Sequence, residues 1–358
     1  MKRRFSAASA LLLLILAAGC VETPSCGFGV DFSPDGKQIA FPDVAGKDLV
    51  IALMNTDGSG YRVVARTAVP NPPVWSPDGR HILFCDGDGL CLYDVQARKV
   101  RRLRDIAPIG YTWSADGGQI VCLMREGPEA IWLDARSGEI LLSVSLPTEP
   151  LGMMPGMNLA PIPQTWGVAF IASDGNLYSV EAGRVYQITR TGDVRSLWVS
   201  DDGSHLRWVR SPKSAKRYLV VHEYDMASRA VSGEVHRFDV QPLSPQKGYQ
   251  VLGADGVFSP DGQRLLIWAY FTRSGKPEEE PKLVAVGTAN IEGQMILPIL
   301  QVNRLVRVTK ESPVPIASRW SPDGSHVALQ IVGEKQILLW LGRADGTGGR
   351  VLRHIKTQ

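Results

Sequence analysis

Alternating apolar and polar positions recur along this chain behind one short turn sequence. From Phe32 to Phe41 the chain reads FSPDGKQIAF: an aromatic residue, a four-residue turn and an apolar-rich run. Proline presets φ at the second turn position, aspartate suits the third and glycine adopts positive φ at the fourth. Such a turn joins two antiparallel strands. Related copies begin at Phe32, Trp75, Trp113, Val199, Phe258 and Trp320.

The spacing of these copies predicts the architecture. Successive copies lie about 40 residues apart, except for one interval of double length and two that contain insertions, and repeats of ~40–45 residues with four strands are typical of propeller blades. The double interval indicates a degenerate repeat, which makes seven. We therefore expect an all-β, seven-bladed β-propeller of four-stranded antiparallel blades over residues 28–358. The expected blades span about 28–66, 72–104, 109–147, 148–191, 194–241, 251–309 and 314–357.

The repeat also carries a family resemblance. The F/W-S-P-D-G-x-x-I-A-F pattern, followed by a strand at Leu49–Asn55 and the turn Thr56-Asp57-Gly58, resembles the TolB-like β-propeller repeat. The resemblance implies a periplasmic propeller that binds an envelope protein. TolB has six repeats and a separate N-terminal domain, so this chain is not expected to be TolB or to share its partner. No spare strand is evident to complete the last blade, so we expect the ring to close by packing blade 7 against blade 1.

The N-terminal segment is predicted to be a lipoprotein signal peptide. Lys2, Arg3 and Arg4 precede an apolar-rich run that ends in Leu16-Ala17-Ala18-Gly19-Cys20, and the run is shorter than a membrane-spanning helix. This ending resembles the bacterial lipobox; the alternative is an ordinary secretory signal that ends near a cysteine. We expect a signal peptide at residues 1–19, lipid on Cys20, a tether at residues 20–27 and, because Val21 is not aspartate, an outer-membrane anchor facing the periplasm.

The charge of the chain is balanced. It contains 39 Lys and Arg against 36 Asp and Glu, and three of the basic residues lie in the signal segment. Nothing in this balance favours nucleic acid as a partner. We expect a monomer whose partner is an envelope protein or a cell-wall component.

Insertions interrupt the repeat at the face opposite the turns. Loops on a rigid repeat scaffold are often its binding surface, so we expect the partner there, across blades 4 to 6. The inserted segments are Ser211–Arg217, Thr272–Lys282, Pro147–Pro163 and Gln241–Gln250. The candidate binding residues are Lys213, Lys216, Arg217, Arg273, Lys276, Glu278, Glu279, Glu280, Met153 and Met154. The alternative is that these loops only tolerate insertions.

Catalytic and metal-binding motifs are not evident. The sequence contains no GxSxG, no HExxH and no phosphate-binding glycine loop. His81, His205 and His326 occupy one repeat position in separate blades, so they should lie around a ring and not in one coordination sphere. The turn aspartates are explained by turn chemistry. We expect no metal and no cofactor.

Four cysteines remain besides Cys20. Cys85 and Cys91 flank a glycine-rich hairpin turn and could pair across it in an exported protein. Cys122 aligns with apparent core positions and is expected as a buried thiol, although Cys26 could reach it if the N-terminal segment folds back.

Two functions are compatible with these features. The first is a membrane-anchored, non-enzymatic binding or scaffold module, and we expect no enzyme activity. The alternative is an enzyme in the propeller channel, such as a polysaccharide lyase, since oligogalacturonate lyases are seven-bladed propellers with broadly similar repeats. Arg319 and Trp198 are scattered candidates for such a site. Polar residues that converge on the inner strands would favour the enzyme.

Overall fold

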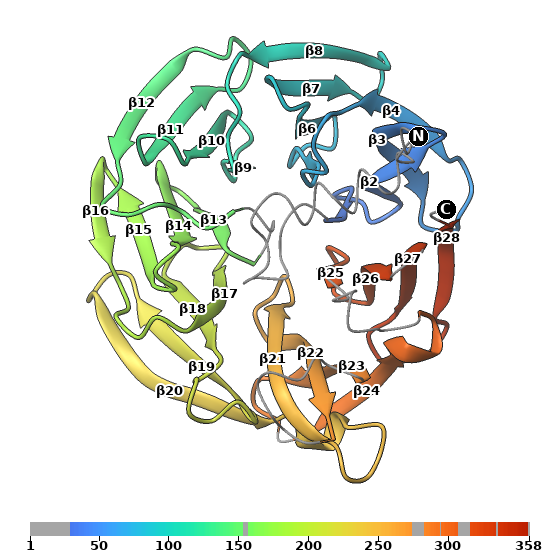
Figure 1. Cartoon of the computed structure of the whole chain (residues 1–358). Helices are drawn as coiled ribbons and strands as arrows, with labels where there is room; N and C mark the ends of the chain where they lie inside the picture. The colour runs from blue at the N-terminus through green and yellow to red at the C-terminus, as the bar shows by residue number, and fades with distance from the viewer. Residues whose placement is uncertain are drawn as a thin grey trace, which may run out of the picture.

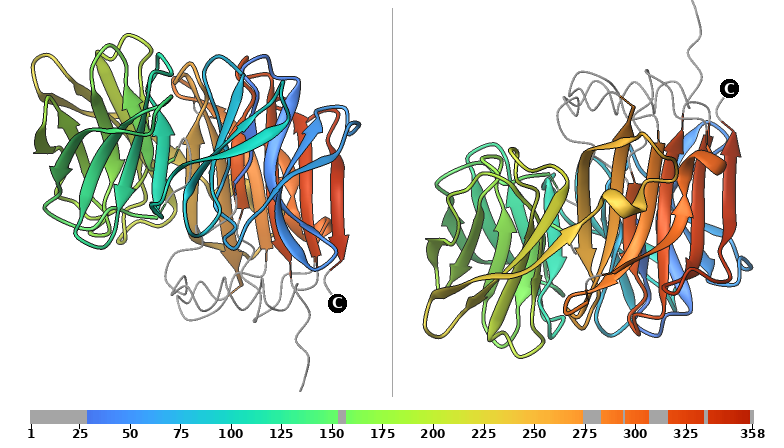
Figure 2. Two further views of the ribbon diagram at one scale, coloured as in Figure 1. Left: turned by 90° about the horizontal axis from the view of Figure 1, so that it is seen from above. Right: turned by 90° about the horizontal axis from the view of Figure 1, so that it is seen from below.

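The computed structural model describes residues 29–152, 157–273, 283–293, 295–306, 316–333 and 336–356. These residues form seven four-stranded antiparallel sheets arranged in a ring, so the predicted seven-bladed β-propeller is confirmed (Figure 1). Each sheet follows the chain order from the innermost to the outermost strand. Figure 2 views the ring from the side, where the strands run along its axis.

The blades have the following strands. Blade 1 contains β1 (Asp31–Phe32), β2 (Gln38–Ala45), β3 (Asp48–Asn55) and β4 (Arg62–Arg66), and blade 2 contains β5 (Val74–Trp75), β6 (His81–Cys85), β7 (Leu90–Asp94) and β8 (Lys99–Arg104). Blade 3 contains β9 (Gly110–Trp113), β10 (Gln119–Met124), β11 (Glu129–Asp134) and β12 (Ile140–Ser145), and blade 4 contains β13 (Leu159–Ile162), β14 (Gly167–Ile171), β15 (Leu177–Glu181) and β16 (Arg184–Gln187).

The second half of the ring has longer strands. Blade 5 contains β17 (Val194–Val199), β18 (His205–Arg210), β19 (Tyr218–Asp225) and β20 (Ala230–Asp239), and blade 6 contains β21 (Gln250–Phe258), β22 (Arg264–Thr272), β23 (Leu283–Asn290) and β24 (Ile296–Gln301). Blade 7 contains β25 (Ile316–Trp320), β26 (His326–Gly333), β27 (Gln336–Arg343) and β28 (Arg350–Lys356). Two short 3₁₀ helices, Gln241–Leu243 and Val302–Arg304, flank blade 6.

The repeated turn is held by a small hydrogen-bond network. In blade 1 the Ser33 hydroxyl donates to Asp35 Oδ1 at 2.6 Å and accepts the backbone N–H of Gln38 at 2.9 Å. The same pair of bonds recurs in blades 2, 3, 5, 6 and 7. The six turn glycines have φ between 64° and 73°, a region that glycine adopts without strain. The turn chemistry inferred from the sequence is therefore confirmed.

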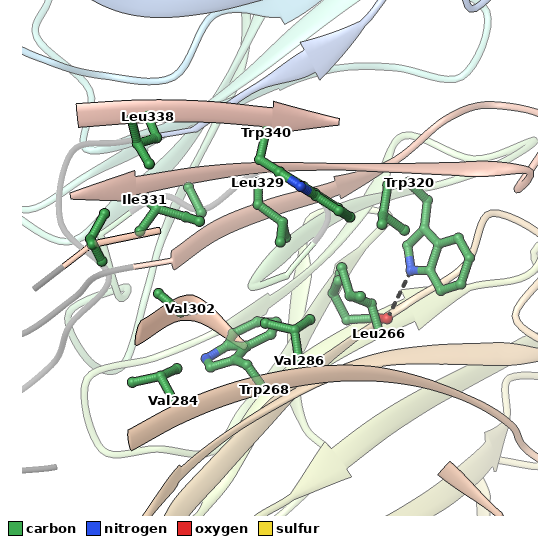
Figure 3. Packing of buried hydrophobic residues seen from close by; sticks show 14 of the residues in the cluster. Leu266, Trp268, Val284, Val286, Val302, Trp320, Leu329, Ile331, Leu338 and Trp340 are labelled. Atoms are coloured by element: carbon green, nitrogen blue, oxygen red, sulfur yellow. Dashed lines mark hydrogen bonds between the residues drawn. The ribbon is translucent and has the colours of Figure 1, made fainter. Parts of the chain in front are cut away.

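Neighbouring blades interlock at these turns. Gly36 faces Pro322 of blade 7, Gly79 faces Pro34, and Gly117 faces Pro77, so the proline of one turn lies against the glycine of the next. Below the turns the blades share apolar cores. Figure 3 shows the core between blades 6 and 7, where the Trp320 indole N–H donates to the Val257 carbonyl at 3.1 Å.

The ring closes by packing, as expected, because blade 7 is a complete four-stranded sheet of its own. In Figure 1 its outer strand β28 lies beside blade 1. Arg353 of β28 donates to the buried carboxylate of Asp43 at 3.1 Å, and the Tyr61 hydroxyl donates to the same oxygen at 2.9 Å. The Gln330 side-chain amide donates to the Pro42 carbonyl at 2.8 Å. Polar contacts thus join the two ends of the ring around an apolar core.

Blade 4 departs from the repeat. Its first strand, β13, lies inside Pro147–Pro163, the segment that the sequence indicated as a connector. Four residues, 163–166, replace the usual turn, and the Thr165 hydroxyl donates to the Ile162 carbonyl at 3.0 Å. The connector therefore supplies a strand and crosses from the opposite face to the turn face.

The predicted pairing of Cys85 with Cys91 is wrong. In the hairpin Cys85 lies opposite Leu90, while Cys91 lies opposite Phe84. This shift of one residue places the two side chains on opposite faces of blade 2. Both thiols are buried and free, as is Cys122, the expected buried thiol. The signal segment, Cys20 and Cys26 lie outside the described residues.

Candidate functional site: a funnel at the turn face

A cavity of about 710 Å³ opens at the centre of the turn face. We call it the funnel. Its volume lies in the range of ligand pockets, ~300–1,000 Å³. Its walls combine aromatic residues from the ends of the innermost strands with prolines from the turns and from β13. The aromatic residues are Phe32, Trp75, Trp198, Phe258 and Trp320, and the prolines are Pro34, Pro77, Pro161, Pro163, Pro260 and Pro322.

The charged groups of the funnel are mostly acidic. Asp31, Asp201, Asp261 and Arg319 line it. Arg319 donates to Asp31 Oδ1 at 2.9 Å, and Asp31 also accepts the backbone N–H of Trp75 at 2.8 Å. Arg319, the one guanidinium among the described residues that line the funnel, is therefore paired, and these residues present apolar surface with an excess of carboxylate.

Trp198 is held in place as part of the funnel wall. Its indole N–H donates to the Pro260 carbonyl of blade 6 at 2.8 Å. The Arg207 guanidinium lies 5.6 Å from the indole centroid and donates to the Gly262 carbonyl at 2.9 Å. Gly262 has no side chain, and a Cβ there would come within 2.6 Å of the ring. The indole is thus fixed before any ligand arrives.

A second polar pair joins two innermost strands and is not part of the funnel lining. Arg195 of β17 lies 3.7 Å from Asp255 of β21, and the buried Oδ1 of Asp255 accepts no hydrogen bond. Burial raises the pKa of Asp255 to about 6, and the Arg195 charge offsets only part of this effect. Burial, with Asp255 as the next contribution, also raises the pKa of Tyr270. Asp255 is therefore able to exchange a proton near neutral pH.

The three equivalent histidines remain apart in separate blades, as the repeat predicted. His81 lies beside Trp113 of the next blade, with ring centroids 6.5 Å apart, and His326 Nδ1 hydrogen-bonds the Ser325 hydroxyl. Within the described ranges, no three His, Cys, Asp or Glu side chains gather as a metal site would require.

Four of the residues predicted for the opposite face, Lys213, Lys216, Arg217 and Arg273, lie within the described part of the chain. Lys213 is exposed, and Arg217 forms a two-bond ion pair with Asp239. The Arg273 guanidinium lies 5.6 Å from the centroid of the Tyr249 ring, so Arg273 contacts the segment Gln241–Gln250. Met153, Met154, Lys276, Glu278, Glu279 and Glu280 lie outside the described residues, and Lys216 is half-buried.

Comparison with known proteins gives the fold. No protein-family model and no curated protein matches the chain. A structure of oligogalacturonate lyase in complex with manganese aligns with a TM-score of 0.60 at 14% identity over 88% of each chain. Oligogalacturonate lyase from Vibrio parahaemolyticus aligns with a TM-score of 0.58 at 12% identity over 85% of each chain. A TolB structure from Agrobacterium tumefaciens has a TM-score of 0.45 at 18% identity, over 76% of this chain and 93% of that one. The two lyase structures share the fold of this chain.

The expectation that the chain is not an enzyme is overturned by the two lyases. It rested on the lack of a recognised catalytic motif, yet both lyases align with this chain along most of their own length. At this identity the likeness shows the fold and not the activity. Within the described part of the chain, no group of three His, Cys, Asp or Glu side chains is placed to hold a metal ion such as the manganese of the first lyase structure.

Part of the site is predictable from the sequence. Arg319 and Trp198, named as scattered candidates, both line the funnel. Asp255 was missed, since a single aspartate within an apolar strand such as Gly253–Phe258 was the only signal.

No helix in the described part of the chain is long and apolar enough to cross a membrane.

Proposed function

We propose that this protein is a cell-envelope binding protein whose funnel receives an extended, apolar-rich peptide segment of an envelope partner. The observation that carries the proposal is the funnel itself: fixed aromatic side chains, a proline rim and a surplus of carboxylates in one cavity. Rigid aromatic residues in a desolvated pocket are the usual anchors of protein interfaces. The funnel also lies on a closed ring that needs little reorganisation on binding.

The location in the envelope rests on the N-terminal sequence. The basic head, the apolar run and Leu16-Ala17-Ala18-Gly19-Cys20 support lipid attachment at Cys20. Several acyl chains on one cysteine would anchor the propeller stably. Replacing Cys20→Ala should leave an unprocessed precursor and abolish acyl labelling in cells. Normal processing of that variant would contradict the anchor.

Site-specific photo-crosslinking tests where the partner lies. A photoreactive phenylalanine analogue replaces Trp198 in the funnel or, as the matched probe, Arg273 on the opposite face. We expect a discrete crosslinked product in native envelopes from position 198 and none from position 273. The reverse pattern would return the site to the inserted loops and would refute the funnel proposal.

An acidic-sugar lyase is the second candidate, and Asp255 is the specific observation that favours it. A carboxyl group that exchanges its proton near neutral pH beside Arg195 is suited to act as a general base close to a substrate carboxylate. The carboxylates of the funnel disfavour the lyase hypothesis, because they repel a polyanionic substrate. The test is incubation with oligogalacturonate, with and without manganese, and measurement of the unsaturated product. Turnover that Asp255→Asn abolishes would establish the enzyme; its absence under both conditions would exclude this substrate.

A further inference from the structure

A second cavity adjoins the funnel where the ring closes. It has a volume of about 340 Å³, lies between blades 7 and 1 on the turn face, and is called the closure niche. Phe32, Pro322 and Leu341 form its apolar walls, and Asp35, Asp57 and Asp323 contribute carboxylates. Phe32, Pro34 and Pro322 line both the niche and the funnel. The two cavities therefore share part of their walls.

The ring contains an equivalent cavity between blades 2 and 3, of about 390 Å³. Its Leu92 lies opposite Leu83, as Leu341 lies opposite Ala328, and each of these leucines pairs with an arginine of the outermost strand. Those arginines make the same contact with the next blade. Arg101 donates to the Ala135 carbonyl at 3.2 Å, and Arg350 donates to the Thr56 carbonyl at 3.0 Å. The two cavities are thus repeat copies of one site.

The copies differ in charge at one repeat position. The residue after Ala135 is Arg136, and the residue after Thr56 is Asp57; each lines its cavity. The cavity between blades 2 and 3 is consequently lined by two guanidinium groups, of Arg101 and Arg136, and two carboxylates. The closure niche is lined by one guanidinium and three carboxylates. At this position the cavity between blades 2 and 3 has the guanidinium of Arg136, whereas the closure niche has the carboxylate of Asp57.

The carboxylates of the closure niche stay ionised at physiological pH. Hydrogen bonds from Ser321 and Ser325 lower the pKa of Asp323 to about 2. A hydrogen bond from Ser33 likewise lowers the pKa of Asp35. Hydrogen bonds from the side chain and the backbone N–H of Ser59 lower the pKa of Asp57. Lys37 lies 3.7 Å from Asp35 but is largely exposed, so it screens the niche weakly. The niche keeps its negative charge.

We propose that the closure niche binds a lysine or arginine side chain of the peptide segment that occupies the funnel. The aliphatic stem would lie against Phe32 and Leu341, while the charged head would lie among the three carboxylates. Arg136 shows that a guanidinium is accommodated at the corresponding position of the sister cavity. This inference rests on the proposed function and adds a requirement to it: the partner segment carries a basic residue at a fixed spacing from its apolar part.

Selection from a random short-peptide library on the immobilised chain tests the requirement. Peptides that bind should share an apolar cluster and a Lys or Arg at constant spacing from it. The tightest such peptide is then remade with its basic residue replaced by methionine, which keeps the length of the stem. We expect the methionine peptide to bind the unaltered protein about tenfold more weakly, since a partly buried charge-assisted bond contributes about 1.5 kcal/mol.

The substitution Asp57→Arg gives the closure niche an arginine at the repeat position where the cavity between blades 2 and 3 has Arg136. In this variant the basic peptide should lose about tenfold in affinity, and the two peptides should bind about equally. Asp345→Arg is the matched control: it makes the same charge change at the equivalent exposed turn position of blade 7, outside the niche, and should preserve the difference between the peptides.

The outcomes separate this inference from the proposed function. Selected peptides without a basic residue, or an unchanged difference between the peptides in Asp57→Arg, would overturn the niche and leave the funnel proposal standing. Peptides whose affinity does not fall in Trp198→Ala would overturn the funnel proposal itself. An equal loss in Asp57→Arg and Asp345→Arg would show general charge attraction and would also refute the niche.

Discussion

At the scale of the residue, the serine of the repeated turn binds both the turn aspartate and a backbone N–H that begins the next strand. Ser259 is fully buried; its hydroxyl donates to Asp261 and accepts the backbone N–H of Arg264. The motif is therefore readable from sequence because each of its four positions has a separate physical task. The serine hydroxyl supplies the polar contacts, and glycine supplies the positive φ.

Replacing Ser259→Ala should lower the free energy of unfolding by about 1–3 kcal/mol, because a buried N–H loses its acceptor. Urea denaturation followed by fluorescence measures the change. Ser228→Ala removes a similar hydroxyl from an exposed turn on the outer strands and should change stability by less than about 0.5 kcal/mol. Equal effects of the two substitutions would show that burial of the turn network does not matter.

Asp255 makes the opposite contribution to stability. Its folded pKa of about 6 lies above its unfolded value, so ionisation on raising the pH from about 4 to above 6 costs the folded state free energy. Asp255→Asn should therefore stabilise the protein at pH 7 by about 1–3 kcal/mol and have little effect near pH 4. Thermal unfolding at the two pH values checks this. Asp88→Asn, an exposed control, should show no such pH-dependent gain; an Asp255→Asn effect that is independent of pH would contradict the assignment.

At the scale of the element, strand register decides whether two residues that are close in sequence also have side chains in contact. Cys85 and Cys91 flank a hairpin turn, but a shift of one residue in pairing sends their side chains into different inter-blade cores. Blade 4 shows the same limit, because its first strand carries no turn signal and was hidden in a proline-rich segment. The repeat predicts strands wherever its turn is intact, whereas register and irregular turns depend on contacts between blades.

The hairpin cysteines should remain reduced and protected in the folded protein. Burial raises the pKa of Cys91 to about 12 and also raises the pKa of Cys85, so both thiols are neutral and poor nucleophiles. Differential alkylation before and after denaturation, mapped by mass spectrometry, should label Cys85, Cys91 and Cys122 only after unfolding. Recovery of a peptide with Cys85 linked to Cys91 would restore the disulfide.

At the scale of the whole molecule, the ring depends on contacts between its two ends. The Asp43 side chain is 1% exposed and accepts hydrogen bonds from Arg353, Tyr61 and the backbone N–H of Val44. The repeat count predicted seven blades and closure by packing. It did not predict Asp43, since neither Asp43 nor Arg353 belongs to the repeated pattern and their proximity exists only in the closed ring.

Arg353→Met should destabilise the protein by about 2 kcal/mol. Loss of one partner of a buried ion pair typically costs ~3–5 kcal/mol, and the two remaining donors to Asp43 reduce this. Arg237→Met breaks an exposed ion pair with Glu234 and should cost less than about 1 kcal/mol. The two variants are compared by urea denaturation. If they lose the same stability, the contact between β28 and blade 1 does not hold the ring closed.

The funnel was only partly foreseeable for the same reason. Phe32, Trp75 and Trp320 were visible as repeat anchors, but their convergence on one axis is a property of the closed ring. The sequence predicted a binding site at the inserted loops of the opposite face, because insertions can be recognised in a sequence and a cavity cannot. The difference between Asp57 and Arg136 becomes meaningful only when the two cavities are recognised as equivalent.

The most direct test of the central claim is the affinity of one selected peptide for Trp198→Ala and for Trp166→Ala. Both tryptophans lie on the turn face; Trp198 lines the funnel, whereas Trp166 is 52% exposed and lies outside it. Calorimetry should show a loss of about 30-fold or more in Trp198→Ala, as expected for a buried aromatic anchor contributing about 2 kcal/mol, and a change of less than about twofold in Trp166→Ala. Unchanged binding in Trp198→Ala would contradict the account, as would a loss confined to Trp166→Ala.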